Sequence, residues 1–327
     1  MTAAQHAAGA GSTGTWRRVM RDRPLLPLLL LMVLLIGVLQ VARPGIVSID
    51  WVGTTIRFAV PLAILAAAQT LTMLTAGIDL SVAAIASMSA YVVATQAPEQ
   101  GPLVAVLIAL VAAAVAGLVN GVGVGIFRVH PLIMTLGMSL VVLGLVTVYQ
   151  RIMVSAGSRV PEAIAWLGGG TSGGVPNSLL VFVPLAIVVL LGLRRSGYGR
   201  LLYAIGDNEV AARLAGVRVW QVLTVLYVLS GVLAGMAGLV LAGLTNAASA
   251  TLADRFLLPS VAAAVIGGTS IFGGRGGFAG TIVGALILTV LTTLLTVLEM
   301  PEPVRQILFG AIILAVAAAY TRITEES

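Results

Sequence analysis

The chain has 327 residues, of which 59% are hydrophobic and 9% are charged, and its mean hydropathy is +1.09. Soluble domains carry about 25% charged residues, so this chain has too few polar groups to cover a water-soluble globule, and lipid must be its solvent. The composition therefore predicts an all-α polytopic membrane protein. At about 20 residues per helical span, up to roughly ten transmembrane helices fit, and the apolar runs below make about ten. The absence of cysteine excludes disulfides and thiolate metal sites.

All 18 basic residues are arginines, and lysine is absent. A Walker A motif needs its lysine to reach the nucleotide phosphates. The chain therefore cannot form an ordinary ATP site, and we interpret the glycine-rich stretch 273–277 as a tight turn. The pI near 10.5 does not indicate nucleic-acid binding, because the arginines follow the expected membrane topology.

The apolar runs divide the chain into one membrane domain, residues 24–320, between two cytoplasmic tails, residues 1–23 and 321–327. The first run, 24–40, follows a basic segment as in a signal peptide, but no A-x-A-like cleavage site follows it. We therefore interpret it as an uncleaved first span. The further predicted spans lie near 56–75, 80–97, 103–124, 131–150, 178–193, 220–243, 257–272, 278–297 and 303–320. The eighth is short, and we expect a partly inserted or broken helix there.

Arginine placement predicts that both ends of the chain lie in the cytoplasm. With the N-terminus inside, the inner side carries twelve arginines: Arg17, Arg18, Arg21, Arg23, Arg128, Arg194, Arg195, Arg200, Arg213, Arg218, Arg275 and Arg322. The outer side carries six: Arg43, Arg57, Arg151, Arg159, Arg255 and Arg305.

The second and third predicted spans are separated only by the break at residues 77–81, with the sequence GIDLS. A carboxylate between two membrane segments is costly unless it caps a helix, pairs with another polar group or lines a polar path. Two compatible hypotheses follow for Asp79. It caps the third span at Leu80 and Ser81, or it belongs to the translocation path or its gate.

Other polar residues interrupt the apolar sequences of the fourth and fifth predicted spans. The amide of Asn120 can bond across helices or line a polar path. The hydroxyls of Thr135 and Ser139 can bond to the preceding helical turn or offer hydrogen bonds to a passing polyol. Around Asn120, glycines at positions 117, 121 and 125 have the four-residue spacing that lets helix backbones approach closely.

The longest predicted inner loop, residues 194–219, has the signals of a short capped helix. Asp207 or Asn208 can form its N-cap, Glu209 places negative charge in its first turn, and Gly216 can end it in a left-handed conformation.

The predicted short helix is amphipathic. Val210, Leu214 and Val217 share one face, with Arg213 to one side. The helix then either fills a groove on a partner protein or lies on lipid headgroups, held by its arginines.

Three classes of function remain: the membrane subunit of a pump driven by a separate ATPase, a secondary transporter driven by an ion gradient, and an intramembrane enzyme or scaffold. Proton coupling uses Asp, Glu or His within spans, and here only Asp79, at a span edge, qualifies. The sequence has no H-E-x-x-H motif, no G-x-S-x-G motif and no pair of intramembrane carboxylates, so an enzyme has little support. A large inner loop without a nucleotide site favours the pump subunit.

Five stretches, taken in order, resemble the permease subunits of the ribose/xylose family of ABC importers. They are 75–82 (TAGIDLSV), 117–121 (GLVNG), 130–137 (HPLIMTLG), 199–216 (GRLLYAIGDNEVAARLAG) and 265–276 (VIGGTSIFGGRG). The chain departs from the family at Ala76, where glycine is frequent, and at Asp207, where a further glycine often follows Gly206.

This resemblance implies a fold similar to that of the vitamin B12 importer permease, in the bacterial cytoplasmic (inner) membrane. It implies a central path between two permease subunits, either two copies of this chain or this chain and a sister permease. It also implies a periplasmic or extracellular sugar-binding protein and a separate ATPase subunit that binds ATP and Mg²⁺. The cargo would be a monosaccharide such as ribose or xylose, and this chain itself would need no cofactor.

The resemblance also implies roles for individual residues. The inner loop would correspond to the coupling helix that enters the ATPase groove, with contributions from Tyr203, Gly206, Asp207, Asn208, Ala211, Arg213, Leu214 and Gly216. The translocation path or gate would draw on Asp79, Ser81, Asn120, Thr135 and Ser139.

Overall fold

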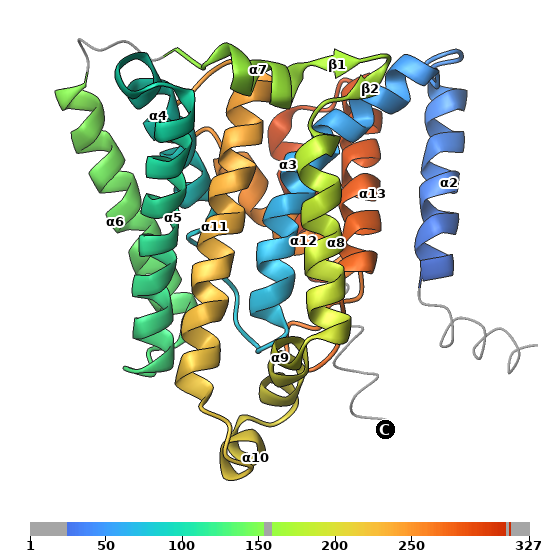
Figure 1. Cartoon of the computed structure of the whole chain (residues 1–327). Coiled ribbons are helices and arrows are strands. Elements are labelled where there is room, and N and C mark those ends of the chain that lie inside the picture. The colour runs from blue at the N-terminus through green and yellow to red at the C-terminus, as the bar shows by residue number, and fades with distance from the viewer. Residues whose placement is uncertain (1–24, 154–158, 312–313, 315–327) are drawn as a thin grey trace, which may run out of the picture.

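A computed structural model describes residues 25–153, 159–311 and 314. The two predicted tails, together with Arg17, Arg18, Arg21, Arg23 and Arg322, lie outside these ranges. The described chain is a bundle of helices (Figure 1). The helices are α2 (Leu25–Ala42), α3 (Ile49–Met73), α4 (Val82–Gln100), α5 (Pro102–Gly125), α6 (Pro131–Ile152), α7 (Glu162–Gly169), α8 (Leu179–Arg195), α9 (Gly197–Asp207), α10 (Glu209–Leu214), α11 (Val219–Thr245), the 3₁₀ turn η2 (Asp254–Phe256), α12 (Leu257–Ile266) and α13 (Phe278–Val297). Residues 302–311 are also helical.

Six helices of the described ranges are long and apolar enough to cross a membrane: α2, α3, α5, α6, α11 and α13. A seventh span results if α8 and α9, which meet at a bend of 66°, are counted as one. These helices make the chain a polytopic membrane protein, but the predicted count of about ten spans is not reached in the described ranges. The predicted eighth span is indeed short, since α12 has 10 residues. Much of the predicted tenth span, 303–320, lies outside the described residues.

Helix α11 runs through the middle of the bundle (Figure 1). In its most apolar 18-residue window 72% of the residues are buried, against 6% for α2. Glycines of α5 let the two backbones meet, because a Cβ on Gly121 would lie 2.7 Å from the Cα of Thr224. The close-packing role expected for this glycine spacing is confirmed.

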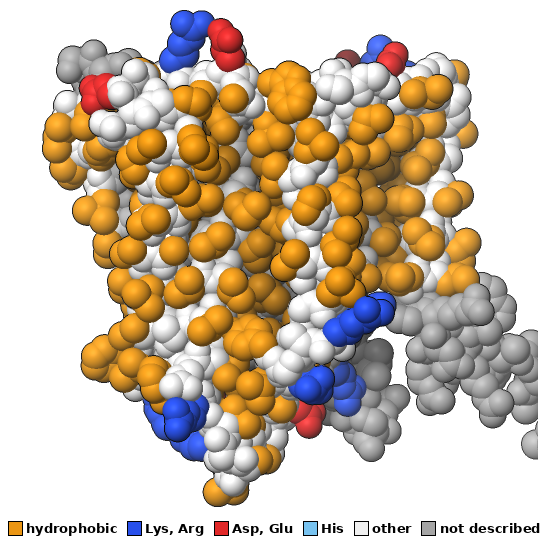
Figure 2. All heavy atoms as spheres, viewed as in Figure 1, with side chains coloured by type: hydrophobic (Ala, Val, Ile, Leu, Met, Phe, Trp, Pro, Cys, Tyr) orange, Lys and Arg blue, Asp and Glu red, His pale blue; other side chains and the backbone are white. Residues whose placement is uncertain are grey.

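Hydrophobic side chains cover the middle height of the bundle, whereas arginines and carboxylates gather toward its two ends (Figure 2). Leu140 of α6 and Val188 of α8, for example, are 64% and 69% exposed. A soluble monomer does not expose so much contiguous apolar surface, so this surface faces lipid.

The two ends of the bundle differ in structure (Figure 1). One end, the α10 face, carries α9 and α10. The other end, the α7 face, carries α7 and a small antiparallel hairpin of β1 (Thr171–Ser172) and β2 (Val175–Pro176). The Arg57 guanidinium holds α7 in place by donating from Nη1 to the carbonyl of Gly169 at 2.9 Å. Neither α7 nor the hairpin was predicted from the sequence.

Helix α3 begins at Ile49, earlier than the predicted span start near residue 56. The hydroxyl of Ser48 accepts a hydrogen bond from the backbone N–H of Trp51 at 3.2 Å. This cap satisfies a free N–H of the first turn and extends α3 toward the α7 face.

Candidate functional site

The break between α3 and α4 contains a completely buried carboxylate, that of Asp79. Its Oδ1 accepts hydrogen bonds from the backbone N–H of Ser81 at 2.9 Å and from the Ser81 hydroxyl at 2.6 Å. Its Oδ2 accepts one from the hydroxyl of Ser230, in α11, at 2.7 Å. No basic side chain pairs with it among the described residues. Hydroxyl and backbone donors therefore satisfy the carboxylate, which joins the start of α4 to α11.

Side chains from neighbouring helices fix the same break. The Gln69 amide of α3 donates from Nε2 to the carbonyl of Asp79 at 2.8 Å and accepts from the Asp79 N–H at 3.3 Å. Asn120 of α5 donates from Nδ2 to the Ser81 hydroxyl at 2.8 Å. We call Gln69, Asp79, Ser81, Asn120, Thr135 and Ser230 the break network.

Thr135 of α6 completes this network, because its hydroxyl accepts from the backbone N–H of Leu80 at 3.0 Å. Four of the predicted path residues thus lie together. Ser139 does not join them, since its hydroxyl donates to the carbonyl of Leu136 in its own helix at 2.7 Å. The sequence reasoning missed Gln69 and Ser230, although each is a polar residue within an apolar span, which is itself a signal.

Ala76, just before the break, has a left-handed backbone with φ +59°. This region favours glycine, because a Cβ there crowds the following carbonyl. Glycine would relieve this strain at the same position.

The predicted inner loop, 194–219, contains two helices, where a single short one was expected. The hydroxyl of Ser196 caps α9 by accepting from the N–H of Gly199 at 2.9 Å. Of the two predicted caps for the second helix, Asn208 is used, since its Oδ1 accepts from the N–H of Ala211 at 2.9 Å. Asp207 is instead the last residue of α9.

The C-terminal end of α10 is a Schellman motif. Gly216 has φ +86° and its N–H bonds to the carbonyl of Arg213 at 3.0 Å, while the N–H of Val217 reaches back to the carbonyl of Ala212 at 3.1 Å. Gly216 therefore ends the helix as the sequence predicts.

The apolar face predicted for α10 divides in the structure. Val210 and Leu214 are 67% and 84% exposed, whereas Val217 lies beyond the end of the helix and lines a cavity. Arg213 forms an ion pair with Glu209 along the helix. Within the described part of the chain, α10 thus presents two uncovered aliphatic side chains beside a charged pair.

Helix α9 contacts the chain immediately before the break. Gly206 lies against the carbonyl of Leu74, where a Cβ would collide with the oxygen, and this carbonyl also accepts a hydrogen bond from the N–H of Gly274 at 3.0 Å. The hydroxyl of Tyr203 donates to the carbonyl of Gly276 at 2.9 Å. The α9–α10 segment is therefore anchored to the end of α3 and to the glycine-rich turn 273–277.

A cavity of about 820 Å³ lies between α10 and the break. Its polar lining residues are Thr75, Arg128, His130, Glu209, Arg213, Arg218, Trp220 and Tyr227. At its inner end the Tyr227 hydroxyl is buried without a hydrogen-bond partner in the described ranges, and a Cβ on Gly77 would lie 2.9 Å from it. Asp79, Ser81, Asn120 and Thr135 do not line this cavity, so the break network lies behind its wall.

Comparisons with known proteins agree with the resemblance seen in the sequence. A profile of the family described as branched-chain amino acid transport system / permease component matches residues 52–317. The chain is 34% identical to the ribose import permease of Escherichia coli, across 88% of this chain and 90% of that relative. It is 36% identical to the ribose import permease of Bacillus subtilis, across 77% and 78% of the two chains, and 34% identical to the fructose import permease of Rhizobium meliloti, across 78% and 73%. No solved structure matches the chain significantly.

Proposed function

The chain belongs to the family of permease components of branched-chain amino acid transport systems, and from that premise we propose that it is the transmembrane permease subunit of an ATP-driven importer of a monosaccharide. The observation that carries this proposal is its identity of 34–36% with ribose and fructose import permeases over most of its length. The family description names amino acids whereas these relatives are named for sugars, so the substrate class rests on the relatives. A periplasmic or extracellular binding protein would deliver the sugar.

A separate ATPase subunit binds ATP and Mg²⁺ in this proposal, and the permease catalyses no bond change. The lack of lysine supports a partner with the nucleotide site. The docking element is α10, with α9 behind it. Exposed aliphatic side chains at Val210 and Leu214 on a helix fixed by two caps suit insertion into a groove of that partner.

The architecture that we propose is a ten-span permease with both ends in the cytoplasm, similar to the vitamin B12 importer permease, in the bacterial inner membrane. Three further elements support this count beyond the seven spans above: the 19-residue α4, the ten-residue α12 and the helical residues 302–311. Two permeases, identical or sister chains, would enclose the path.

Transport proceeds by alternating access. Closure of the ATPase dimer moves α10 and α9, and the contact of Gly206 with Leu74 passes that motion to the end of α3. Asp79, Ser81, Asn120, Thr135 and Ser139 remain the proposed path or gate residues. The first four would move as one unit, because hydrogen bonds join the side chains of Asp79, Ser81 and Asn120 while Thr135 binds the backbone N–H of Leu80 between them.

The test is extraction in mild detergent from native membranes, followed by mass spectrometry of the co-purifying proteins. We expect a stoichiometric nucleotide-binding subunit, whose ATPase activity rises when a sugar-loaded binding protein is added to reconstituted vesicles. A clean homo-oligomer without an ATPase would overturn the proposal. That result would favour the alternative, an ion-gradient-driven transporter of a small polar solute, with Asp79 as its first candidate for ion coupling.

A further inference from the structure

A second cavity, of about 410 Å³, lies at the α7 end of the bundle. Its walls are the first turns of α3, the last turns of α13, residues of η2 and α12, and the helical residues from 302 onward. A volume of this size is within the range of small-molecule sites. The cavity lies on the face opposite α10, so the proposed ATPase coupling does not use it.

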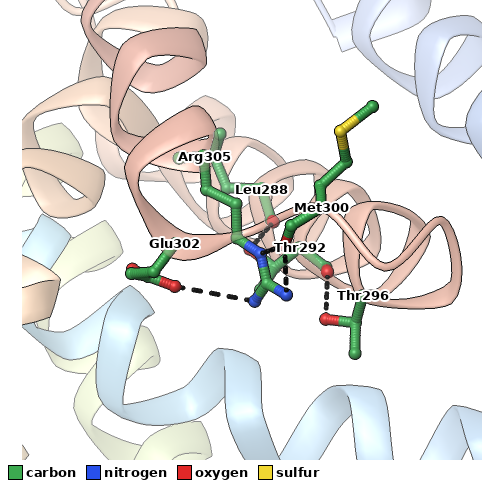
Figure 3. Close-up of polar contacts among 6 residues, drawn as sticks. All are labelled: Leu288, Thr292, Thr296, Met300, Glu302 and Arg305. Carbon is green, nitrogen blue, oxygen red and sulfur yellow. Dashed lines mark hydrogen bonds and ion pairs between the residues drawn. The ribbon is translucent and has the colours of Figure 1, made fainter.

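One wall of this cavity is a column of hydrogen-bond acceptors. Thr289, Thr292, Thr293 and Thr296 all line it from α13. Each hydroxyl donates its hydrogen to the carbonyl four residues earlier, at 2.8–3.0 Å, as Figure 3 shows for Thr292 and Thr296. Because a hydroxyl has one hydrogen and two lone pairs, these oxygens are left to accept hydrogen bonds from a ligand.

Other walls supply donors. The indole Nε1 of Trp51 is buried without a partner among the described residues, which is costly unless a ligand or water accepts its hydrogen bond. The Arg305 guanidinium donates to the carbonyl of Met300 from Nε at 3.2 Å and from Nη2 at 3.1 Å, and its Nη1 lies 3.7 Å from Glu302 (Figure 3). These contacts hold Arg305 in place while leaving further N–H groups of its five unused.

The cavity therefore combines acceptors, donors and aromatic rings. Phe58, Phe256 and Phe309 supply aromatic rings to its lining. A sugar hydroxyl both donates and accepts, and the C–H face of a sugar ring suits an aromatic wall. A phosphate or carboxylate fits less well, because the threonine oxygens can only accept. Glu302 offsets the charge of Arg305, and the second guanidinium of the lining, Arg255, lies over the ring of Phe256 at 5.2 Å.

We propose that this cavity is a binding site for a single neutral monosaccharide on the α7 side of the permease. The site rests on the proposed function, since it would receive the sugar that the binding protein releases. Trp51 would donate to a ring or hydroxyl oxygen, and the threonines of α13 would accept from the sugar hydroxyls.

The experiment uses the full chain, with its ATPase subunit, in lipid nanodiscs. Replacing Trp16, Trp166 and Trp220 by Phe leaves Trp51 as the only tryptophan of this chain, and the same complex with Trp51→Phe gives the background signal of its partners. Titration with D-ribose or D-fructose should give a saturable change in its fluorescence. Thr292→Val should then weaken the apparent affinity about five- to tenfold, as expected for one lost hydrogen bond.

The matched control is Thr147→Val in α6, because its hydroxyl makes the same bond to the carbonyl four residues earlier, at 2.8 Å, but lies outside the cavity. It should leave the titration unchanged. Equal affinities for wild type, Thr292→Val and Thr147→Val would overturn the site, as would a fluorescence change that follows lipid acyl composition and not sugar.

Sugar uptake by the reconstituted importer separates the two proposals. Uptake without any response of Trp51 would reject the site and retain the function. A saturable Trp51 response in a complex that imports no sugar would reject the function and retain the site.

Discussion

The hydrogen bond between Ser230 and Asp79 gives the sharpest test of the break network. Ser230→Ala removes a hydrogen bond of 2.7 Å to a fully buried carboxylate. A hydrogen bond to a charged group contributes about 1.5–3 kcal/mol and one between neutral groups about 0.5–1.5 kcal/mol. Ser230→Ala should therefore lower the free energy of unfolding by about 2 kcal/mol in the wild type, but by only about 1 kcal/mol in an Asp79→Asn background.

The double-mutant cycle consists of the wild type, Ser230→Ala, Asp79→Asn and the variant with both substitutions. The free energy of unfolding of each protein is measured in mixed micelles at increasing SDS fraction. A coupling free energy of about 1 kcal/mol is expected. Ser260→Ala in α12 is the matched control, because this buried serine donates only to the carbonyl of Leu257 in its own helix. If Ser230→Ala costs the same with and without the Asp79 charge, and no more than Ser260→Ala, the network does not hold the break as argued.

The same Asp79→Asn variant decides between the two hypotheses for this carboxylate. Uptake that falls well beyond the loss of folded protein would support a role in the path or gate. Normal uptake with a modest loss of stability would leave capping of α4 and attachment to α11 as its whole role.

Three further substitutions test the surroundings of the break. Gly206→Val should abolish uptake while the protein stays in the membrane, because the new side chain would displace the carbonyl of Leu74; uptake and membrane content are measured together. Arg213→Glu should reduce both uptake and ATPase co-purification, since it replaces an exposed ion pair with a second carboxylate beside Glu209, while stability changes by less than about 1 kcal/mol. Ala76→Gly should raise stability by about 0.5–1 kcal/mol by relieving the left-handed strain at φ +59°.

Matched variants separate these effects from general damage. Gly144→Val in α6 adds the same side chain at a glycine with open space around it and should leave uptake unchanged. Ala215 has an ordinary φ of −75°, so that Ala215→Gly relieves no strain and should lower stability by about 0.5–1 kcal/mol. Equal effects of Ala76→Gly and Ala215→Gly would contradict the strain argument.

The parts of the fold that could be predicted depend on local signals. Long apolar runs predict spans because each span must satisfy its own backbone in lipid. Asn208 and Gly216 likewise mark the ends of α10, because caps act within a few residues. The sequence also indicates a broken segment at residues 77–81, since a carboxylate there has no place in a continuous apolar helix.

The parts that were missed depend on contacts distant in sequence. Ser230 lies 151 positions from Asp79, and nothing in α11 alone indicates that its hydroxyl meets a carboxylate. Helix α9 has a local signal, the Ser196 cap, that the prediction overlooked. Its position against the bundle, however, comes from the distant contacts of Tyr198, Tyr203 and Gly206. Ser139 was grouped with Thr135 because both are hydroxyl residues of the fifth predicted span, yet only Thr135 bonds to the break.

These contacts also show where motion of α9 would first be felt. Helix α9 touches Leu74, five positions before Asp79. The cavity beside it is lined by Thr75 and Tyr227, but not by Asp79, Ser81, Asn120 or Thr135. The break network draws on α3, α5, α6 and α11, so disturbing it separates several hydrogen bonds at once. A shift at Gly206 reaches the wall formed by Thr75 and Tyr227 before it reaches that network. Impaired uptake in Gly206→Val with an undisturbed coupling between Ser230 and Asp79 is therefore the expected combination.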